Sequence, residues 1–364
     1  MASVVLVEPY YGGSHQAWAD SWVRHSAHDI SLITHPDEFW RWRLRGGAVT
    51  LAESFASHVG DHGAPDVVVV SGLVDVAGFV GQARRSLGGV PVATYVHESQ
   101  LLYPLAPNQR TDSSAALINW QSLVASDAVW FNSAFHRDEL RNALPRLLDA
   151  QPAPTHSHLI ADVFARASVL WPGVETNLLA NHTRSSRSVP LVVWNQRWDH
   201  DKNPHAVFSA LANLAEDGVP FRLALAGQNQ QRGSRKLGAV LDRLRDRIDH
   251  QGFVPNKAYT DLLLRSDVVV SAADHEFFGI AIVEAIAAGA LPVLPQRLSF
   301  PELIEPRWHE LALYPDGELR SRLRHVLVNH AEVRGELAGL RDSMRQFDAS
   351  LSAAAHDDAV NRLI

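Results

Sequence analysis

The chain has 364 residues, of which 46% are hydrophobic and 20% charged, and this is the composition of an ordinary globular protein. It contains no cysteine, which excludes a disulfide framework and a thiolate metal site. The formal net charge of −7 gives no general attraction to nucleic acid, although a local basic patch stays compatible with it.

The length favours two domains rather than one. Residues 1–8 lack the basic start of a signal peptide and reach Glu8 early. The sequence has no run of about 18 apolar residues, so we expect no membrane span. A cytoplasmic protein is the expectation that follows.

The first predicted unit is a strand, a glycine turn and a helix. Residues 4–7 are apolar, Gly12 and Gly13 follow, and residues 16–24 have a helical pattern. The turn is not GxGxxG, which argues against a dinucleotide-binding oxidoreductase. The two glycines either let the backbone approach a ligand closely or form a plain tight turn.

A second strand at residues 30–34 leads to a segment with three arginines and two tryptophans, residues 38–45. Interleaved aromatic and basic side chains can stack on bases and neutralise phosphates. The alternative is an amphipathic loop whose tryptophans pack inward. A helix is predicted afterwards at residues 51–59.

Residues 90–96 form another predicted strand, and His97 and Glu98 come directly after it. A histidine at the carboxyl end of a parallel strand faces the usual ligand edge, so this pair is an acid–base or polar ligand candidate. A purely structural histidine is the alternative. The next strand ends near Ser133, and a helix over residues 135–144 is expected to stop at Pro145.

The polar stretch at residues 176–189 is the predicted interdomain linker, and a second series of strands and helices follows it. A strand at residues 191–194 precedes a loop that contains Arg197 and Lys202. Two cations at this edge could neutralise a diphosphate.

Two glutamates lie around the turn between an apolar strand, residues 267–271, and a helix, residues 280–288, that Gly289 ends. Glu276 precedes the helix and Glu284 lies one turn inside it. The free N–H groups of a helix start suit a phosphate, and carboxylates bind sugar hydroxyls. The alternative is a capping carboxylate and a solvated helix glutamate.

The fold class is therefore α/β, with two Rossmann-like, doubly wound domains that face a central cleft. We expect a first domain at residues 1–180 and a second domain, with the candidate phosphate- and sugar-binding residues, at residues 181–345. Residues 346–364 are expected to form a helical tail that can cross back to the first domain.

Five blocks in order resemble one family: residues 8–15 (EPYYGGSH), 40–43 (WRWR), 97–104 (HESQLLYP), 197–204 (RWDHDKNP) and 275–279 (HEFFG). The two glutamates are similar to the donor motif of GT-B enzymes of glycosyltransferase family 4. The full set of blocks resembles the tRNA-queuosine α-mannosyltransferases.

The resemblance implies a retaining, metal-independent transfer of a hexose, with GDP-mannose as co-substrate and no other cofactor. Glu284 would hold the nucleotide ribose and Glu276 the sugar hydroxyls. Arg197 and Lys202 would bind the diphosphate. The implied backbone donors are those of Phe278, Gly279 and Ile280. No metal ligand is expected, because the Asp-x-Asp letters at 199–201 lie between the two cations.

In the first domain the resemblance places His97 beside the transferred sugar, so that the implied catalytic set is His97, Glu276, Arg197 and Lys202. Gly12 and Gly13 would approach the donor. The implied acceptor contacts are His15, Trp40, Arg41, Arg43, Glu98 and Gln100.

The implied acceptor is queuosine in a tRNA anticodon. Two alternatives stay open at this point: a family 4 enzyme that glycosylates a lipid, a glycan or a small metabolite, and a non-catalytic nucleotide-binding module. The sequence leaves the donor and the oligomeric state undecided.

Overall fold

A computed structural model describes residues 1–104, 112–180, 188–227 and 234–364, without the side chains of Ala180 and Asn256. The chain divides into two compact units. Unit 1 comprises Met1–Gly173 and Ala349–Ile364, and unit 2 comprises Val174–Asp348. The division falls at Gly173, whereas the sequence suggested residue 180. The predicted linker begins with a short helix, and its residues 181–187 lie outside the described part.

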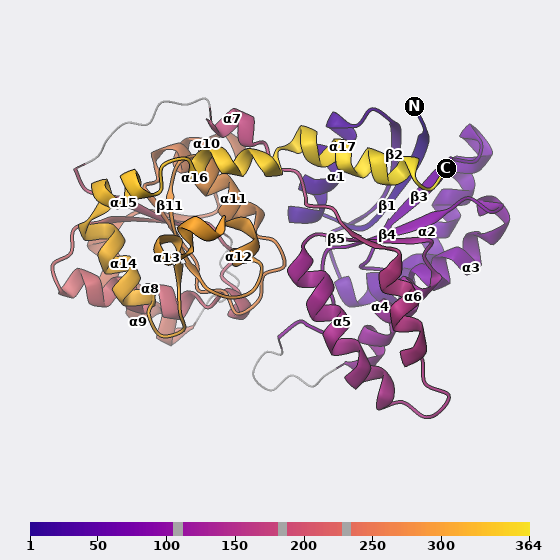
Figure 1. Cartoon of the computed structure of the whole chain (residues 1–364), viewed down its shortest axis with the longest axis horizontal. Coiled ribbons are helices and arrows are strands. Elements are labelled where there is room, and N and C mark those ends of the chain that lie inside the picture. Colours follow the sequence, from indigo (N-terminus) through magenta and orange to yellow (C-terminus); the bar gives the residue numbers. More distant parts are fainter. Residues whose placement is uncertain (105–111, 181–187, 228–233) are drawn as a thin grey trace. The chain divides into compact units, whose positions relative to one another are not determined.

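Unit 1 is built on a six-stranded sheet in the order β2-β1-β3-β4-β5-β6 (Figure 1). Every neighbouring pair is parallel. The strands are β1 Ser3–Tyr11, β2 Asp29–Pro36, β3 Val67–Ser71, β4 Val92–Val96, β5 Ala128–Phe131 and β6 Ala167–Val169.

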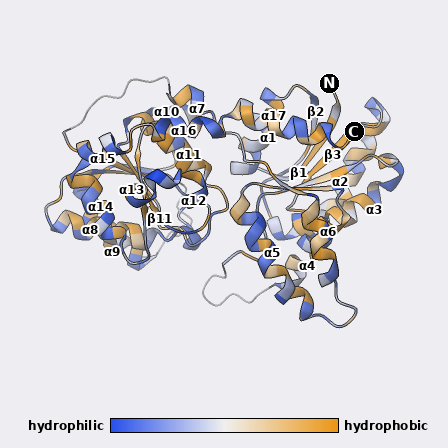
Figure 2. Ribbon diagram, in the orientation of Figure 1, coloured by the Kyte–Doolittle hydropathy of each residue, from blue (hydrophilic) through white to orange (hydrophobic). Residues whose placement is uncertain are grey.

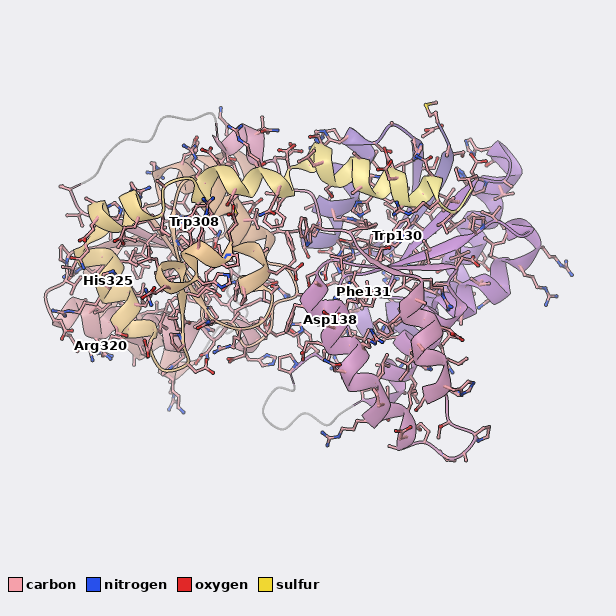
Figure 3. The ribbon with its side chains drawn as sticks, viewed as in Figure 1. Trp130, Phe131, Asp138, Trp308, Arg320 and His325 are labelled. Atoms are coloured by element: carbon pink, nitrogen blue, oxygen red, sulfur yellow. The ribbon has the colours of Figure 1, made fainter. Side chains whose placement is uncertain are left out.

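The strands of this sheet are apolar on both faces because helices cover both. Val4 and Leu6 of β1 belong to one hydrophobic cluster, while Val5 and Val7 belong to another. Figure 3 labels Trp130 and Phe131, which are consecutive in β5 and likewise join different clusters. Figure 2 shows the strands mostly in hydrophobic colours and the helices in both colours.

The helices of unit 1 are α1 Gly13–His25, α2 Trp40–His62, α3 Val76–Leu87, α4 Ser113–Ala125, α5 Ala134–Asp149, α6 Ile160–Ala165 and α17 Ala349–Asn361, with a 3-10 turn η1 Ser157–Leu159. The prediction that Pro145 ends a helix is wrong, since α5 continues past it. Leu140, Leu144 and Leu148 form one buried face, and their burial outweighs the backbone hydrogen bond that proline cannot make.

The carboxyl-terminal helix α17 packs on α1 within unit 1, as the yellow and indigo ribbons of Figure 1 show. Asp357 accepts hydrogen bonds from Trp22 Nε1 at 2.9 Å, Ser26 Oγ at 2.6 Å and the Ala27 backbone N at 2.7 Å. Trp18 Nε1 donates to His356 Nε2 at 3.1 Å. The last helix therefore holds the helix that follows β1.

Unit 2 repeats the architecture with a parallel sheet in the order β12-β11-β10-β7-β8-β9. Its strands are β7 Leu191–Trp194, β8 Arg222–Ala226, β9 Ile248–Gly252, β10 Val268–Val270, β11 Leu291–Pro295 and β12 Leu313–Tyr314. The predicted α/β class with two parallel sheets is confirmed.

The helices of unit 2 are α7 Thr176–Ala180, α8 Pro204–Glu216, α9 Arg235–Leu244, α10 Asn256–Arg265, α11 Ile280–Ala287, α12 Phe300–Leu303, α13 His309–Ala312, α14 Leu319–Val328, α15 His330–Glu336 and α16 Leu340–Ser343. Its 3-10 turns are η2 His200–Lys202, η3 Arg245–Arg247, η4 Pro306–Trp308 and η5 Met344–Phe347. Among the described residues of both units, no helix is long and apolar enough to cross a membrane.

Candidate active site

Lys202 lies at the centre of a polar cluster at the carboxyl edge of the unit 2 sheet. It follows β7 in the turn η2, and its side chain is largely buried. The Lys202 Nζ donates to the His275 carbonyl at 2.7 Å and to Glu276 Oε2 at 3.1 Å. The Asp201 carboxylate lies 3.3 Å from the same Nζ. Two predicted site residues 74 positions apart, Lys202 and Glu276, are thus in direct contact.

The two loops that carry Lys202 and Glu276 are joined through their backbones. The Asp201 carbonyl accepts from the backbone N of Asp274 at 2.7 Å and of His275 at 3.3 Å. On the other side, Ser299 Oγ donates to the Phe278 carbonyl at 3.0 Å. These contacts hold the turn between β10 and α11 in one conformation before any ligand arrives.

Helix α11 begins at this turn, and Gly279 caps it with φ of 100°. A residue with a side chain rarely adopts that conformation, which explains the glycine. The Phe278 side chain is buried against Phe347, with ring centroids 5.3 Å apart. Any contact of Phe278 with a ligand therefore has to come from its backbone. The first N–H groups of α11 have no carbonyl of their own helix to bond, so they can serve an anion.

Glu284 lies inside α11 and is half-buried. It accepts a hydrogen bond from the Tyr259 hydroxyl at 2.9 Å, and that hydroxyl also accepts from Asn195 Nδ2 at 3.0 Å. Burial raises the pKa of Glu284 to about 7, while the hydrogen bond from Tyr259 pulls the pKa down. The alternative of a solvated helix glutamate is wrong. Tyr259 and Asn195 were not predicted, because nothing local in the sequence marks them as partners of Glu284.

Arg197 is more exposed than Lys202, with 57% of its side chain accessible, and it lies 3.3 Å from Asp199. The two carboxylates of the Asp-x-Asp letters are therefore each paired with a cation: Asp199 with Arg197, and Asp201 with Lys202. Burial, together with the nearby Lys202, lowers the pKa of His275 to about 4, so this imidazole is neutral at pH 7.

Unit 1 gathers three titratable side chains at the carboxyl edge of its own sheet. Glu8, near the end of β1, lies 3.1 Å from His15 Nδ1 through one oxygen and 3.8 Å from His97 Nε2 through the other. The two imidazole rings lie 4.0 Å apart, and all three side chains are almost fully buried. Burial, reinforced by neighbouring histidines, holds the pKa of His97 well below its usual value. His97 is therefore a neutral imidazole beside a buried carboxylate.

Glu8 was not predicted as a site residue, although it ends a buried strand just before the glycine turn. The possible ligand atoms of Glu8, His15 and His97 all lie within 4.8 Å of one another. Two imidazoles and one carboxylate form a donor set that suits zinc or iron. The cluster is thus a set of side chains that could hold a metal ion, where the sequence predicted none.

Comparison with known proteins gives the family. A sequence model described as "tRNA-queuosine alpha-mannosyltransferase N-terminal" matches residues 3–174, and one described as "Glycosyl transferases group 1" matches residues 181–318. The chain is 28% identical over 310 residues to the tRNA-queuosine alpha-mannosyltransferase of Drosophila melanogaster. The aligned segment covers 82% of this chain and 81% of that protein.

The solved structures agree on the fold. Sucrose-phosphate synthase from Thermosynechococcus elongatus matches with a TM-score of 0.76 at 16% identity and covers 100% of this chain and 99% of its own. The catalytic domain of starch synthase IV from Arabidopsis thaliana matches with a TM-score of 0.75 at 11% identity, over 100% and 99% of the two chains. With the two sequence models, this match makes the chain a glycosyltransferase of the GT-B fold.

In this glycosyltransferase the loop after β4 is held by amide side chains. Asn132 Nδ2 donates to the His97 carbonyl at 2.9 Å, and the backbone N of Gln100 donates to Asn119 Oδ1 at 2.9 Å. The Gln100 side chain donates to Glu98 at 2.8 Å. Glu98 and Gln100 therefore lie together, and both are partly exposed.

The two glycines of the first turn differ in their surroundings. A Cβ on Gly12 would lie 2.1 Å from the Asp37 carboxylate, so a residue of the enzyme already occupies that space. Gly13 has φ of 53°, and a Cβ there would meet nothing within 4 Å. Gly12 is thus required by Asp37, and only Gly13 has open space beside its Cα. Contact of either glycine with the donor stays a prediction.

The segment at residues 38–45 is the start of helix α2 rather than a loop. The Arg41 guanidinium lies 4.5 Å from the centre of the Trp40 ring. Trp42 is 64% exposed, so the expectation of inward-packed tryptophans is wrong for this residue. Arg43 is partly buried and Arg45 pairs with Asp112. Trp40, Arg41 and Arg43 thus lie on one turn of helix, and their contact with an acceptor stays a prediction.

Proposed function

We propose that this glycosyltransferase transfers mannose from GDP-mannose to queuosine in a tRNA anticodon, with retention of configuration and without a metal ion. Within this proposal it is a family 4 enzyme of the cytoplasm, where tRNA is modified. The contact between Lys202 and Glu276 at the start of α11 carries the donor half. The match of residues 3–174 to the tRNA-queuosine mannosyltransferase model supports the acceptor half.

The donor is assigned to unit 2. The diphosphate binds at Lys202, at Arg197 and at the first N–H groups of α11, including those of Gly279 and Ile280. Lys202 is now paired with Glu276, so an arriving phosphate competes for the ammonium and releases the carboxylate. Glu276 then accepts hydrogen bonds from the hydroxyls of the sugar. Asp201 keeps the ammonium in position throughout.

The ribose of the donor binds Glu284. A carboxylate accepts two hydroxyl hydrogen bonds well, and Tyr259 already orients Glu284 from one side. Hydroxyl donors favour the ionised form, so ribose binding lowers the raised pKa of this glutamate.

The transfer needs stabilisation of a leaving diphosphate and of an oxocarbenium-like sugar. The bond from the anomeric carbon to the diphosphate oxygen breaks, and a bond from the acceptor oxygen forms on the same face. The proton of the acceptor hydroxyl passes to the departing phosphate oxygen. Arg197, Lys202 and the start of α11 stabilise the negative charge that grows on this oxygen. For His97 of unit 1, contact with a hydroxyl of the transferred sugar stays a prediction.

The acceptor is assigned to unit 1, whose predicted contacts are His15, Glu98, Gln100 and the first turn of α2. A cyclopentene diol presents two hydroxyls, and Glu98 and Gln100 offer an acceptor and a donor side by side.

The experiment is incubation with GDP- and UDP-sugars and queuosine-containing tRNA, followed by mass spectrometry of the nucleosides. We expect a gain of one hexose on queuosine with GDP-mannose. Absence of that gain with every tRNA, together with transfer to a lipid, glycan or metabolite, would overturn the acceptor. Lys202→Ala should lower turnover at least ~100-fold, because a preorganised charge at the leaving group is lost.

Exposed Lys257 of α10 supplies the control, since Lys257→Ala removes the same charge from a side chain with none of the contacts described for Lys202. Near-normal turnover of Lys202→Ala would contradict the phosphate assignment. Each assay is repeated after dialysis against EDTA, which should leave turnover unchanged. A loss that zinc or iron restores would instead assign a metal to the Glu8, His15 and His97 cluster.

A further inference from the structure

Two aromatic side chains at the start of α2 in unit 1 are exposed to solvent. Phe39 is 75% exposed and Trp42 is 64% exposed. Large rings that reach solvent to this extent bury little apolar surface and contribute little to folding. Both rings follow the carboxyl end of β2 within six residues. They are therefore candidates for binding rather than for the core.

Phe39 occupies its position against local preference. It is the N-cap of α2 and has φ of 54°, in the left-handed region. Its carbonyl accepts from the backbone N of Trp42 at 2.8 Å and of Arg43 at 3.1 Å, but its side chain caps nothing. A bulky residue is strained in this conformation, and the missing side-chain cap lowers the stability of the helix further. Asparagine tolerates the left-handed conformation better than phenylalanine, and its side chain can also cap the helix. The phenyl ring is therefore retained at a cost to stability.

Trp42 lies flat against the helix because the residue one turn later is Gly46. A Cβ on Gly46 would lie 2.8 Å from Cη2 and Cζ2 of the Trp42 ring. Glycine inside a helix is less stable than alanine. The glycine thus provides the space in which the indole rests, with its outer face open.

The surroundings of the two rings are charged rather than apolar. Arg41 is exposed beside Trp42, and Arg45 pairs with Asp112 at the start of α4. Asp37 and Glu38 are exposed just before Phe39. Protein interfaces are enriched in aromatic residues and arginine, but they are depleted of the aspartate and glutamate that surround these rings. Isolated rings beside arginines are instead typical of surfaces that stack on unpaired bases.

The rings also lie on the reacting side of unit 1. Tyr11 of β1 is in register with Pro36 of β2, and Asp37 fills the space beside Gly12. His97 follows β4, which is three strands from β2 in the same sheet. At a strand spacing of about 4.8 Å, the two strands are ~14 Å apart. An RNA loop is therefore long enough to reach from the end of β2, which the rings follow, to the end of β4, which His97 follows.

We propose that Phe39 and Trp42 form a stacking surface for unpaired bases of the acceptor RNA. This inference rests on the proposed function, which makes the acceptor a tRNA loop. Stacking provides the binding here, because Asp37, Glu38 and Asp112 offset the charges of Arg41, Arg43 and Arg45. The surface selects looped RNA over duplex RNA, in which the bases are already stacked.

The experiment measures binding of a labelled RNA hairpin with a seven-base loop, and of a fully paired duplex, by fluorescence anisotropy without donor. Trp42→Ala and Phe39→Asn should each weaken hairpin binding about tenfold, the loss of one stacked base. Phe39→Asn should unfold at the same or a higher denaturant concentration than the wild type, so that weaker binding is not misfolding. Binding should depend only weakly on salt.

Gly46→Ala gives the sharpest comparison, because a single methyl group displaces the Trp42 ring while alanine favours the helix. Gly60→Ala is the matched control in the same helix, where a Cβ would meet nothing within 4 Å. Gly46→Ala should weaken hairpin binding severalfold and Gly60→Ala should leave it unchanged.

The outcomes separate this inference from the proposed function. If Trp42→Ala and Phe39→Asn both bind the hairpin as tightly as the wild type, the stacking surface is overturned, even where hexose transfer to tRNA is intact. Hairpin binding that needs both rings, without hexose transfer to any tRNA, supports the surface and overturns the acceptor. The chain could instead self-associate, and Trp42→Ala could abolish this self-association without affecting RNA binding. That result would assign the rings to contact with a second copy of the chain and would overturn the inference.

Discussion

Glu284 shows how one residue can serve a donor site only because others surround it. Helix α11 and the Tyr259 side chain remove much of its contact with water, and this burial raises the pKa to about 7. Without a bound donor, the Glu284 side chain with that pKa is half protonated at neutral pH. Ribose hydroxyls donate hydrogen bonds and need the charged form.

Donor affinity should therefore rise as the pH increases from 6 to 8. We expect several-fold tighter binding of the intact nucleotide sugar at pH 8, measured by titration calorimetry. Glu284→Gln should bind weakly with no pH dependence over this range. Tyr259→Phe should move the rise in affinity to higher pH. The hydrogen bond from Tyr259 lowers the pKa of Glu284, so its removal raises that pKa. A pH profile in Glu284→Gln like that of the wild type would contradict the assignment.

At the scale of single elements, α17 is the clearest case of a helix that serves a distant part of the chain. Its Asp357 accepts three hydrogen bonds from residues of α1 and the turn after it. Trp18 of α1 in turn packs edge-on against His97, with ring centroids 4.7 Å apart. The last helix of the chain thus supports the histidine cluster of unit 1.

Asp357→Ala should destabilise the protein by about 2–3 kcal/mol, because the buried donors of Trp22 and Ala27 lose their acceptor. Urea unfolding followed by tryptophan fluorescence measures the change. The neighbouring Asp358 is exposed, so Asp358→Ala is the matched control and should shift the midpoint very little. Equal midpoints for the two variants would show that α17 does not hold α1 as described.

At the scale of the whole molecule, the two units differ in how their buried groups respond to acid. Unit 1 contains His356, whose pKa burial lowers to about 4, and His97, whose pKa is also lowered. Unit 2 contains His275 with a pKa of about 4, but also Glu284 with a pKa of about 7. A lowered histidine pKa makes the folded state lose stability as the pH falls below about 6.5. A raised glutamate pKa makes the folded state gain stability as the pH falls below about 7.

Unit 1 should consequently be the more acid-sensitive unit. His356 alone contributes on the order of 3 kcal/mol that is present above pH 6.5 and is lost toward pH 4. Protonation of its Nε2 also breaks the hydrogen bond from Trp18. Hydrogen exchange at pH 7 and pH 5, corrected for intrinsic rates, should show a larger loss of protection in unit 1. Earlier loss in unit 2 would refute this reading of the buried groups.

Much of the fold could be predicted, because its signals are local. The runs at residues 4–7 and 90–96 are apolar and short, and both contain strands that lie inside the sheet, β1 and β4. The two glutamates around residue 280 were placed at a helix start by the strand before them and the glycine after them. The predicted helix end at Pro145 failed because the burial of neighbouring leucines outweighed the local signal of proline. The inward packing considered for Trp42 failed because its ring lies over Gly46, which no local pattern indicates.

The sequence by itself determined the α/β alternation, the strand ends that carry polar residues and the types of residue available for the site. Only the tertiary structure decided which of these meet: Lys202 with Glu276, Glu284 with Tyr259, and Glu8 with His97. The physical reason is that periodicity and turn chemistry act over a few residues. A contact between residues 25 to 90 positions apart depends instead on strand order and helix packing, which no local pattern specifies.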